Sequence, residues 1–291
     1  MVNSNAESSR LIKNALTVDV EDYFQVSAFE PYIDKSKWDL LPHRVEKNTQ
    51  KILDLFDSKG VKATFFTLGW VAERYPDLIH RIVDAGHELA CHGYEHIRVT
   101  EQTPEQFRDD VAKTKKILED ISGQAIKGYR AASYSIGAKN LWALDVLQEL
   151  GFQYSSSIYP VKHDLYGMPD APRFIFEPIN NQSFKEIPIT TIRFGDKNIP
   201  CGGGGFFRFY PYAFSKWAFK HVNDKEHQPA IFYFHPWEID PEQPRQQGLS
   251  LKTKTRHYLN LNKMEGRINR LLSDFAWDSM ENVFLKQPKN L

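Results

Sequence analysis

Short apolar runs alternate along the chain with stretches in which apolar residues recur every three or four positions. Six of the runs have the length and the β-branched or aromatic content of strands: 15–20, 63–69, 87–92, 127–132, 152–159 and 231–237. The periodic stretches predict helices over 45–59, 76–85, 103–121, 141–150 and 264–275. Because strands that alternate with helices build βαβ units, the pattern predicts a parallel α/β sheet, open or closed.

The alternation is interrupted between 160 and 210, a region rich in proline, glycine and aromatic residues. We expect short strands in the run EIPITTIRF (186–194) and a flexible loop at 202–205, which are four consecutive glycines. No Lys-Ser or Lys-Thr pair follows these glycines, so they do not resemble a phosphate-binding loop. They are expected to let the backbone approach a ligand or to let the loop move.

The charge balance narrows the choice of partner. Lys and Arg number 37, and Asp and Glu also number 37. Binding to nucleic acid or to an anionic membrane depends on an excess of basic side chains, so neither partner is expected. Nothing in the composition settles whether the chain forms an oligomer.

Cysteine usage and the N-terminal segment predict a cytoplasmic protein. Cys91 and Cys201 are the two cysteines, far apart in sequence, which does not indicate a disulfide scaffold. The first fifteen residues lack the apolar core of a secretion signal. No apolar run approaches the roughly 18 residues of a membrane span. We predict Cys91 as a small buried side chain that points away from its neighbour His92.

Polar side chains of the types that bind metals follow three of the predicted strands. The acidic cluster at 19–22 ends the first strand, His92 ends the third, and His235 lies in the last. The carboxyl ends of parallel strands gather at one edge, so these residues are expected to meet. His92 and His96 have the spacing of one helical turn. Such a pair with one carboxylate leaves positions for water, as in catalytic zinc sites.

Ordered motifs give a family resemblance over most of 15–238. TVDVED (17–22), HGYEH (92–96), YRAASYS (129–135) and FYFH (232–235) stand in the order and spacing of the polysaccharide deacetylase motifs. The chain resembles that family, carbohydrate esterase family 4, whose nodulation-type members deacetylate chitooligosaccharides. Its closest similarity is to the subgroup encoded in exopolysaccharide and exosortase loci.

The resemblance implies a fold and a division of the chain. We expect a distorted (β/α) barrel of about seven parallel strands over 1–240. A helical C-terminal extension, 241–291, is expected to pack on the barrel.

The resemblance also implies roles for the acidic and imidazole groups. Glu21, His92 and His96 would be the metal ligands, and Asp19 would be the general base. The family has adjacent acids, whereas one residue separates them here. Strand alternation places Asp19 and Glu21 on one face, which favours Glu21 as the ligand. Asp22 is the alternative ligand if the strand ends before it.

Two further roles follow from the resemblance. Arg130 would hydrogen-bond Asp19 and keep it ionised, since a nearby positive charge favours the carboxylate. His235 would be the general acid. The family often supplies an aspartate to tune this histidine; Asp145 and Asp164 are the candidates, and neither can be placed.

The function implied is that of a metal-dependent hydrolase that removes N-acetyl groups from amino sugars of a polysaccharide or oligosaccharide, in exopolysaccharide biosynthesis. Zinc is the expected cofactor, with cobalt, nickel and manganese as alternatives. Tyr134 and Trp237 are candidate walls for stacking on the N-acetylated glycan, with core packing as the alternative. The alternative functions are an amidohydrolase acting on a small N-acyl or cyclic amide, and an inactive carbohydrate-binding relative. The sequence does not name the sugar or its linkage.

Overall fold

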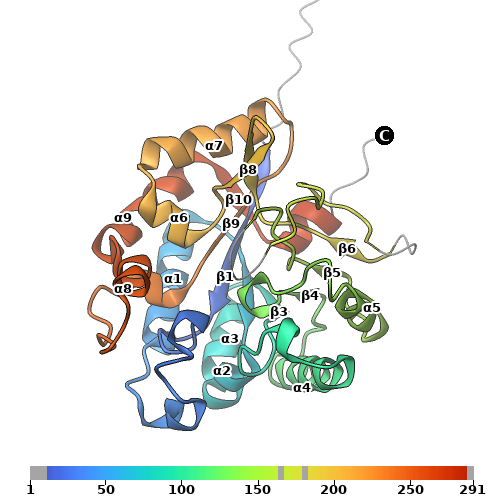
Figure 1. Ribbon diagram of the computed structural model, residues 1–291, viewed down its shortest axis with the longest axis vertical. Helices are drawn as coiled ribbons and strands as arrows, with labels where there is room; N and C mark the ends of the chain where they lie inside the picture. The colour runs from blue at the N-terminus through green and yellow to red at the C-terminus, as the bar shows by residue number, and fades with distance from the viewer. Residues whose placement is uncertain (1–11, 163–166, 179–182, 287–291) are drawn as a thin grey trace, which may run out of the picture.

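A curled parallel sheet runs through the centre of the molecule (Figure 1). The computed structural model describes residues 12–162, 167–178 and 183–286. The eight-stranded sheet has the order β10-β1-β2-β3-β4-β5-β6, and β9 also pairs with β1. Its strands are β1 (Lys13–Val20), β2 (Thr64–Thr67), β3 (Glu88–Cys91), β4 (Gly128–Tyr129), β5 (Tyr154–Ser155), β6 (Lys185–Glu186), β9 (Ile231–Phe234) and β10 (Ala276–Asp278).

Helices surround this sheet in Figure 1, and most of them pack on its outer face. They are α1 (Val45–Lys59), α2 (Gly69–Arg74), α3 (Pro76–Asp84), α4 (Pro104–Ser122), α5 (Trp142–Glu149), α6 (Gly204–Phe209), α7 (Tyr212–Asp224), α8 (Leu251–Tyr258) and α9 (Leu261–Asp274). Short 3-10 helices lie at Ser27–Phe29, Lys35–Leu40, Val99–Glu101, Ala132–Tyr134 and Pro236–Ile239, and a π-helical turn at Glu281–Leu285. Thr103 begins α4 with the expected capping box, in which its side chain and that of Gln106 satisfy each other's backbone N–H.

Strand β1 organises the sheet because it has neighbours on both edges. It pairs with β2 on one side, and on the other with β10 through 13–15 and with β9 through 15–18. Its side chains alternate between two environments. Leu16 and Val18 join the core beneath the helices, whereas Ala15 joins the separate cluster on the concave side. Asp19 therefore projects from the concave face.

The predicted strands are confirmed as a parallel α/β sheet, although most are shorter than the apolar runs. The run at 186–194 divides: Glu186 ends β6 in the main sheet, while β7 (Thr191–Phe194) forms an antiparallel hairpin with β8 (Lys197–Pro200). Helix α7 and strand β10 were not predicted. Cys91 is buried in the outer core, as expected.

The C-terminal helical part is present and packs on the sheet. Leu261, Met264 and Ile268 of α9 are buried in the same core as β1 and α1, and β10 extends the main sheet. A domain boundary at 240 stays a prediction. None of the helices in the described parts of the chain is both long and apolar enough to cross a bilayer.

This packing predicts that the C-terminal helix unfolds together with the sheet. Ile268→Ala removes a fully buried side chain, which typically costs about 2–5 kcal/mol. We expect the single thermal transition to shift downward as a whole, measured by circular dichroism. Asn269→Ala, on the exposed side of α9, should leave the transition in place. An early, separate melting step with the main transition unchanged would contradict the shared core.

Candidate metal centre and active site

The polar residues at the strand ends converge on the concave side of the sheet. Asp19 lies in β1 and Glu21 just beyond it, while His92, Arg130 and His235 follow β3, β4 and β9. These residues are buried, apart from the partly exposed His235. The sheet's curl brings together the ends of strands that are not neighbours. Of the acids that end the first strand, the structure brings Asp19 and Glu21 close to these histidines.

A carboxylate and two imidazoles form a compact cluster. One ligand atom from each of Glu21, His92 and His96 lies within 4.8 Å of the other two. The His96 Nε2 atom is 3.2 Å from Glu21 Oε2, and the two imidazole centroids are 5.3 Å apart. A carboxylate oxygen with two imidazole nitrogens is a donor set that divalent zinc takes in catalytic sites.

The expected helical turn from His92 to His96 is wrong. This segment is a loop in which Gly93 and His96 have positive φ angles, 76° and 54°. Its carbonyl groups bond outward instead: Gly69 N–H donates to Gly93 O, and Trp70 N–H donates to Tyr94 O, at the start of α2. Tertiary bonds to α2 therefore bring the two imidazoles together.

The surroundings keep both imidazoles neutral. His92 Nδ1 lies 2.8 Å from the carbonyl oxygen of Arg130. A carbonyl only accepts, so Nδ1 carries the proton and Nε2 keeps its lone pair, as a metal ligand requires. Burial lowers the pKa of His92, and burial together with His92 and His235 holds that of His96 well below its usual value.

Glu21 supplies a direct test of whether the cluster fits a cation. Burial raises the pKa of Glu21 to about 7, and Asp19 adds to the rise. Its buried Oε2 has no hydrogen-bond donor among the residues described. A positive ion would favour the charged form of Glu21 and would accept a lone pair from Oε2, so it would offset both the raised pKa and the missing hydrogen bond. The cluster fits a divalent metal.

Asp22, the alternative ligand, is engaged elsewhere. Its carboxylate accepts backbone hydrogen bonds from Tyr23, Arg44 and Val45, at 2.8, 2.6 and 2.9 Å. Two of these donors belong to the start of α1, whose first N–H groups need such partners. Asp22 therefore lies outside the three-residue cluster and anchors α1 beneath the site.

Asp19 and Arg130 form a buried ion pair. Arg130 Nη1 lies 2.5 Å from Asp19 Oδ1 and 2.8 Å from Thr17 Oγ1. The other guanidinium nitrogens donate to the backbone and hydroxyl of Ser156, and the side chain is fully buried. Because these bonds fix the guanidinium, Arg130 holds Oδ1 of Asp19 in place. The second oxygen of Asp19, Oδ2, faces His235 Nε2 at 3.9 Å.

His235 has a carboxylate partner that the sequence analysis missed. Its Nδ1 lies 2.8 Å from Glu238 Oε1, and the opposite oxygen of Glu238 accepts from Arg208 Nε at 2.7 Å. Asp145 lies exposed on α5 and is not this partner; Asp164 lies outside the described residues. The available signal was the three-residue spacing after His235, a capping-box pattern.

The pKa values of His235 and Glu238 are shifted in opposite directions. Burial opposes the charged imidazole, but Glu21, Glu238 and Asp19 outweigh it and raise the pKa of His235 to about 9. For Glu238, burial is likewise outweighed, and Arg208 and His235 lower its pKa to about 2. Glu238 is therefore a carboxylate that can hold a proton on Nδ1 of His235.

The two candidate stacking residues are both buried. Trp237 lies between two imidazoles, with centroid distances of 5.2 Å to His235 and 4.2 Å to His257. Its indole Nε1 donates to Glu21 Oε1 at 3.3 Å. Tyr134 is 5% exposed and packs edge-on against Tyr233. The structure favours core packing over a sugar-stacking role for both.

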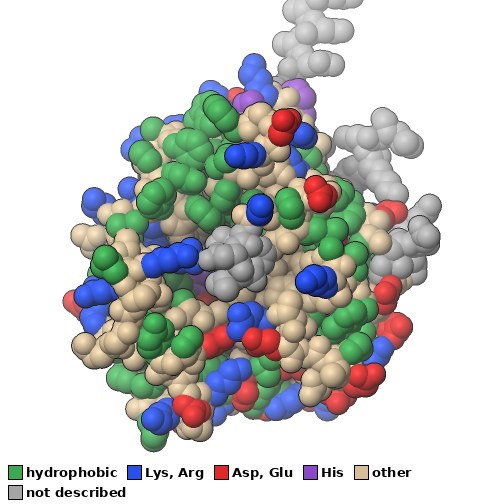
Figure 2. Space-filling view, viewed as in Figure 1, with side chains coloured by type: hydrophobic (Ala, Val, Ile, Leu, Met, Phe, Trp, Pro, Cys, Tyr) green, Lys and Arg blue, Asp and Glu red, His purple; other side chains and the backbone are tan. Residues whose placement is uncertain are grey.

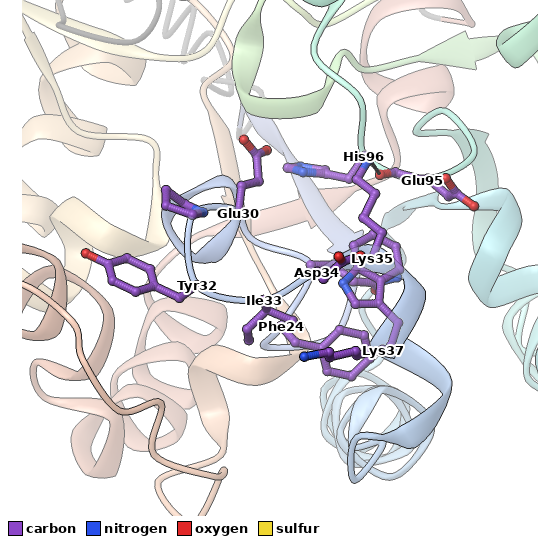
Figure 3. A pocket seen from close by; sticks show the side chains of 12 residues that line it. Phe24, Glu30, Tyr32, Ile33, Asp34, Lys35, Lys37, Glu95 and His96 are labelled. Carbon is purple, nitrogen blue, oxygen red and sulfur yellow. Dashed lines mark hydrogen bonds between the residues drawn. The ribbon is translucent and has the colours of Figure 1, made fainter.

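A pocket of about 430 Å³ adjoins the cluster at His96 (Figure 3). The loop between β1 and α1 supplies most of its wall, and Glu95 completes it beside His96. In Figure 3, Glu30 and Tyr32 lie on one side of the pocket and Glu95 on the other. On the face shown in Figure 2, basic and acidic side chains are interspersed, in keeping with the balanced charge.

Two family models match consecutive segments of the chain. Residues 36–155 match the polysaccharide deacetylase family, and residues 156–285 match a domain of unknown function, DUF3473. The expectation of an exopolysaccharide or exosortase subgroup is not tested by these matches.

Curated relatives match the first segment. A peptidoglycan-N-acetylglucosamine deacetylase of Bacillus cereus is 39% identical over 82 residues, 28% of this chain and 30% of the relative. A peptidoglycan deacetylase of Helicobacter pylori is 32% identical over 113 residues, 39% and 38% of the two chains. A Bradyrhizobium chitooligosaccharide deacetylase is 32% identical over 99 residues, 34% and 43% of the two chains. The match thus spans less than half the length of each relative.

Solved structures share the fold at low identity. A Mycobacterium smegmatis protein, provisionally assigned as a polysaccharide deacetylase, aligns with a TM-score of 0.59 at 18% identity, over 93% of this chain and 89% of its own. A peptidoglycan N-acetylglucosamine deacetylase bound to a substituted N-oxidanyl-benzamide gives 0.52 at 18% identity, over 96% and 90%. A Bacillus anthracis pseudoenzyme of the CE4 family gives 0.50 at 14%, over 94% and 66%.

The sequence match over 36–155 and the shared fold agree with the motifs at the strand ends. Residues 36–155 are therefore similar to the polysaccharide deacetylase family, and residues 156–285 are similar to the domain of unknown function DUF3473.

Proposed function

We propose that this protein is a metal-dependent hydrolase that removes N-acetyl groups from amino sugars of a polysaccharide or oligosaccharide. The observation that carries the proposal is the buried cluster of Glu21, His92 and His96 between a carboxylate, Asp19, and a proton-bearing imidazole, His235. A degenerate site would not keep all these groups together. The relatives named as deacetylases of peptidoglycan and chitooligosaccharide support the substrate class.

Glu21, His92 and His96 would hold the metal, and zinc is the ion we propose, with cobalt, nickel and manganese as alternatives. When bound, a divalent ion of this kind polarises the amide carbonyl and makes water more acidic. The three protein ligands leave positions for both the substrate oxygen and the water.

Asp19 is the proposed general base. Arg130 holds Oδ1, so the second oxygen is the one that can take a proton from the attacking water. The fixed guanidinium orients the Asp19 carboxylate, and both side chains are buried.

His235 is the proposed general acid. Its side chain is 19% exposed, more than those of Asp19 and Glu21, so among these three groups it is the most accessible to a substrate. The Nε2–H bond breaks as the proton moves to the amide nitrogen. That nitrogen also receives the electron pair of the breaking C–N bond, which releases acetate and the free amine.

The adjoining pocket supports a glycan over a small amide as substrate. Pro31, Tyr32, Asp34 and Lys37 in its wall are exposed, so the pocket opens along the surface and does not enclose its contents. An exopolysaccharide precursor and a cytoplasmic site of action remain parts of this proposal. The first is supported by the motif similarity, and the second by the two free, buried cysteines.

Replacing the base tests the assignment of Asp19. Asp19→Asn should lower kcat for acetate release from N-acetylated oligosaccharides by about 10²–10⁴-fold, because the amide cannot accept the proton. Metal content, measured by mass spectrometry, should stay the same. Asp145→Asn, on the exposed face of α5, is the control and should keep full activity. A near-normal rate in Asp19→Asn would exclude the general-base role.

Replacing a ligand tests the metal centre. His96→Ala should lower the bound metal per chain strongly and abolish acetate release, since two protein ligands hold a cation poorly. His80→Ala alters an exposed histidine on α3 and should bind metal normally. Chelator treatment of the unaltered protein, followed by added zinc, should remove and restore activity. Full occupancy in His96→Ala would contradict the proposed ligand set.

A further inference from the structure

The domain of unknown function contributes one half of the site. The three clustered ligands and Asp19 precede residue 156, whereas His235 and Glu238 lie within 156–285. Glu238 accepts twice from His235, from Nδ1 at 2.8 Å and from the backbone N–H at 3.1 Å. Both bonds go to Oε1, so one oxygen fixes the imidazole and the start of the following 3-10 helix.

The other oxygen of Glu238 is fixed by Arg208, which is almost fully buried. The remaining nitrogens of Arg208 donate to the backbone carbonyls of Arg256, His257 and Leu259, at 3.2, 2.9 and 2.8 Å. These carbonyls belong to the end of α8 and the link to α9. The C-terminal segment therefore orients Arg208, Arg208 orients Glu238, and Glu238 orients His235.

The glycine run lets this chain of contacts assemble. A Cβ on Gly204 would lie 2.3 Å from Glu238 Oε1, and one on Gly203 would lie 2.7 Å from the Tyr233 ring. A side chain at either position would displace α6, which carries Arg208, or the contacted side chain of Glu238 or Tyr233. The run therefore serves close packing of α6 against Glu238 and Tyr233.

We propose that Glu238 and Arg208 are positioning residues that hold His235 with its proton on Nε2 directed at the leaving amine, and that supplying this assembly is the role of the domain of unknown function. The inference rests on the proposed deacetylase function. Charged groups near the assembly that could substitute for the pair are excluded by geometry, because Glu21 and Asp19 face Nε2, 3.4 and 3.9 Å away, and not Nδ1.

An N-acetyl amide and an activated acetate ester differ in whether the leaving group needs a proton. An amine leaves an N-acetyl group only if it is protonated as the C–N bond breaks, so the reaction depends on the proton of His235. The 4-nitrophenolate ion leaves 4-nitrophenyl acetate without a proton. Loss of positioning should therefore damage amide hydrolysis much more than ester hydrolysis, whereas general damage to the fold should lower both.

The experiment compares the two substrates in the full-length, zinc-loaded protein. Glu238→Gln and Arg208→Lys are each assayed for acetate release from an N-acetylated oligosaccharide and for nitrophenolate release. We expect kcat for the amide to fall about 10- to 100-fold more than that for the ester, with little change in KM. Melting temperature and metal content are recorded for each variant. Two different substitutions keep the test usable if one of them fails to fold.

A second Arg–Glu pair in the same segment, partly buried, provides the control. Arg173 donates to both oxygens of Glu226, at 2.6 and 3.0 Å, and no contact joins that pair to His235. Glu226→Gln should lower the two activities equally, if at all. If Glu238→Gln and Arg208→Lys behave like Glu226→Gln, the positioning role is overturned.

His235→Ala separates a failure of the positioning inference from a failure of the proposed general-acid role. A selective loss of amide hydrolysis in His235→Ala, without one in Glu238→Gln or Arg208→Lys, would refute only the positioning inference. Equal rates for His235→Ala and the unaltered protein on the amide would refute the proposed general acid itself.

Discussion

The burial of Glu21 is the constraint on which the site depends. A carboxyl group shielded from water loses most of its solvation, and here the pKa of Glu21 rises to about 7 while Oε2 receives no hydrogen bond from the described residues. His92 and His96 are held neutral, so they add lone pairs and no positive charge. Three polar side chains inside a curled sheet are a destabilising arrangement by themselves. A divalent cation would satisfy all three at once.

Two buried arginine–carboxylate pairs, Arg130–Asp19 and Arg208–Glu238, flank this cluster. They differ in what the second carboxylate oxygen contacts. Arg130 binds one oxygen of Asp19 and leaves the other facing His235. Arg208 binds one oxygen of Glu238, but the second oxygen is occupied by the Nδ1 proton of His235. The same pairing therefore yields a carboxylate that can accept a proton in one case and an imidazole that can donate one in the other.

The sequence predicted the parts of the site that local pattern determines. Apolar runs ending in acids or histidines located Asp19, His92 and His235, and alternation along one strand favoured Glu21 over Asp22. Prediction from the sequence failed where contacts between distant segments determine the conformation or the surroundings of a residue. The loop from His92 to His96 is shaped by backbone bonds to α2, and Trp237 is enclosed by His257 from a segment twenty residues later. Strand β10 is three residues long, and its pairing with β1 has no sequence signal beyond a short aromatic run.

The register between β1 and β9 explains how two segments can form one site. Val18 pairs with Phe234, so the next residues along the two strands, Asp19 and His235, leave the sheet side by side. A shift of one residue would turn every side chain of a strand to the opposite face and separate Asp19, the proposed base, from His235, the proposed acid. Apolar packing of Leu16, Val18, Phe232 and Phe234 in one core makes such a shift costly. The positions of the two proposed groups are therefore coupled through the hydrophobic side of the sheet, on the face opposite to the proposed metal ligands.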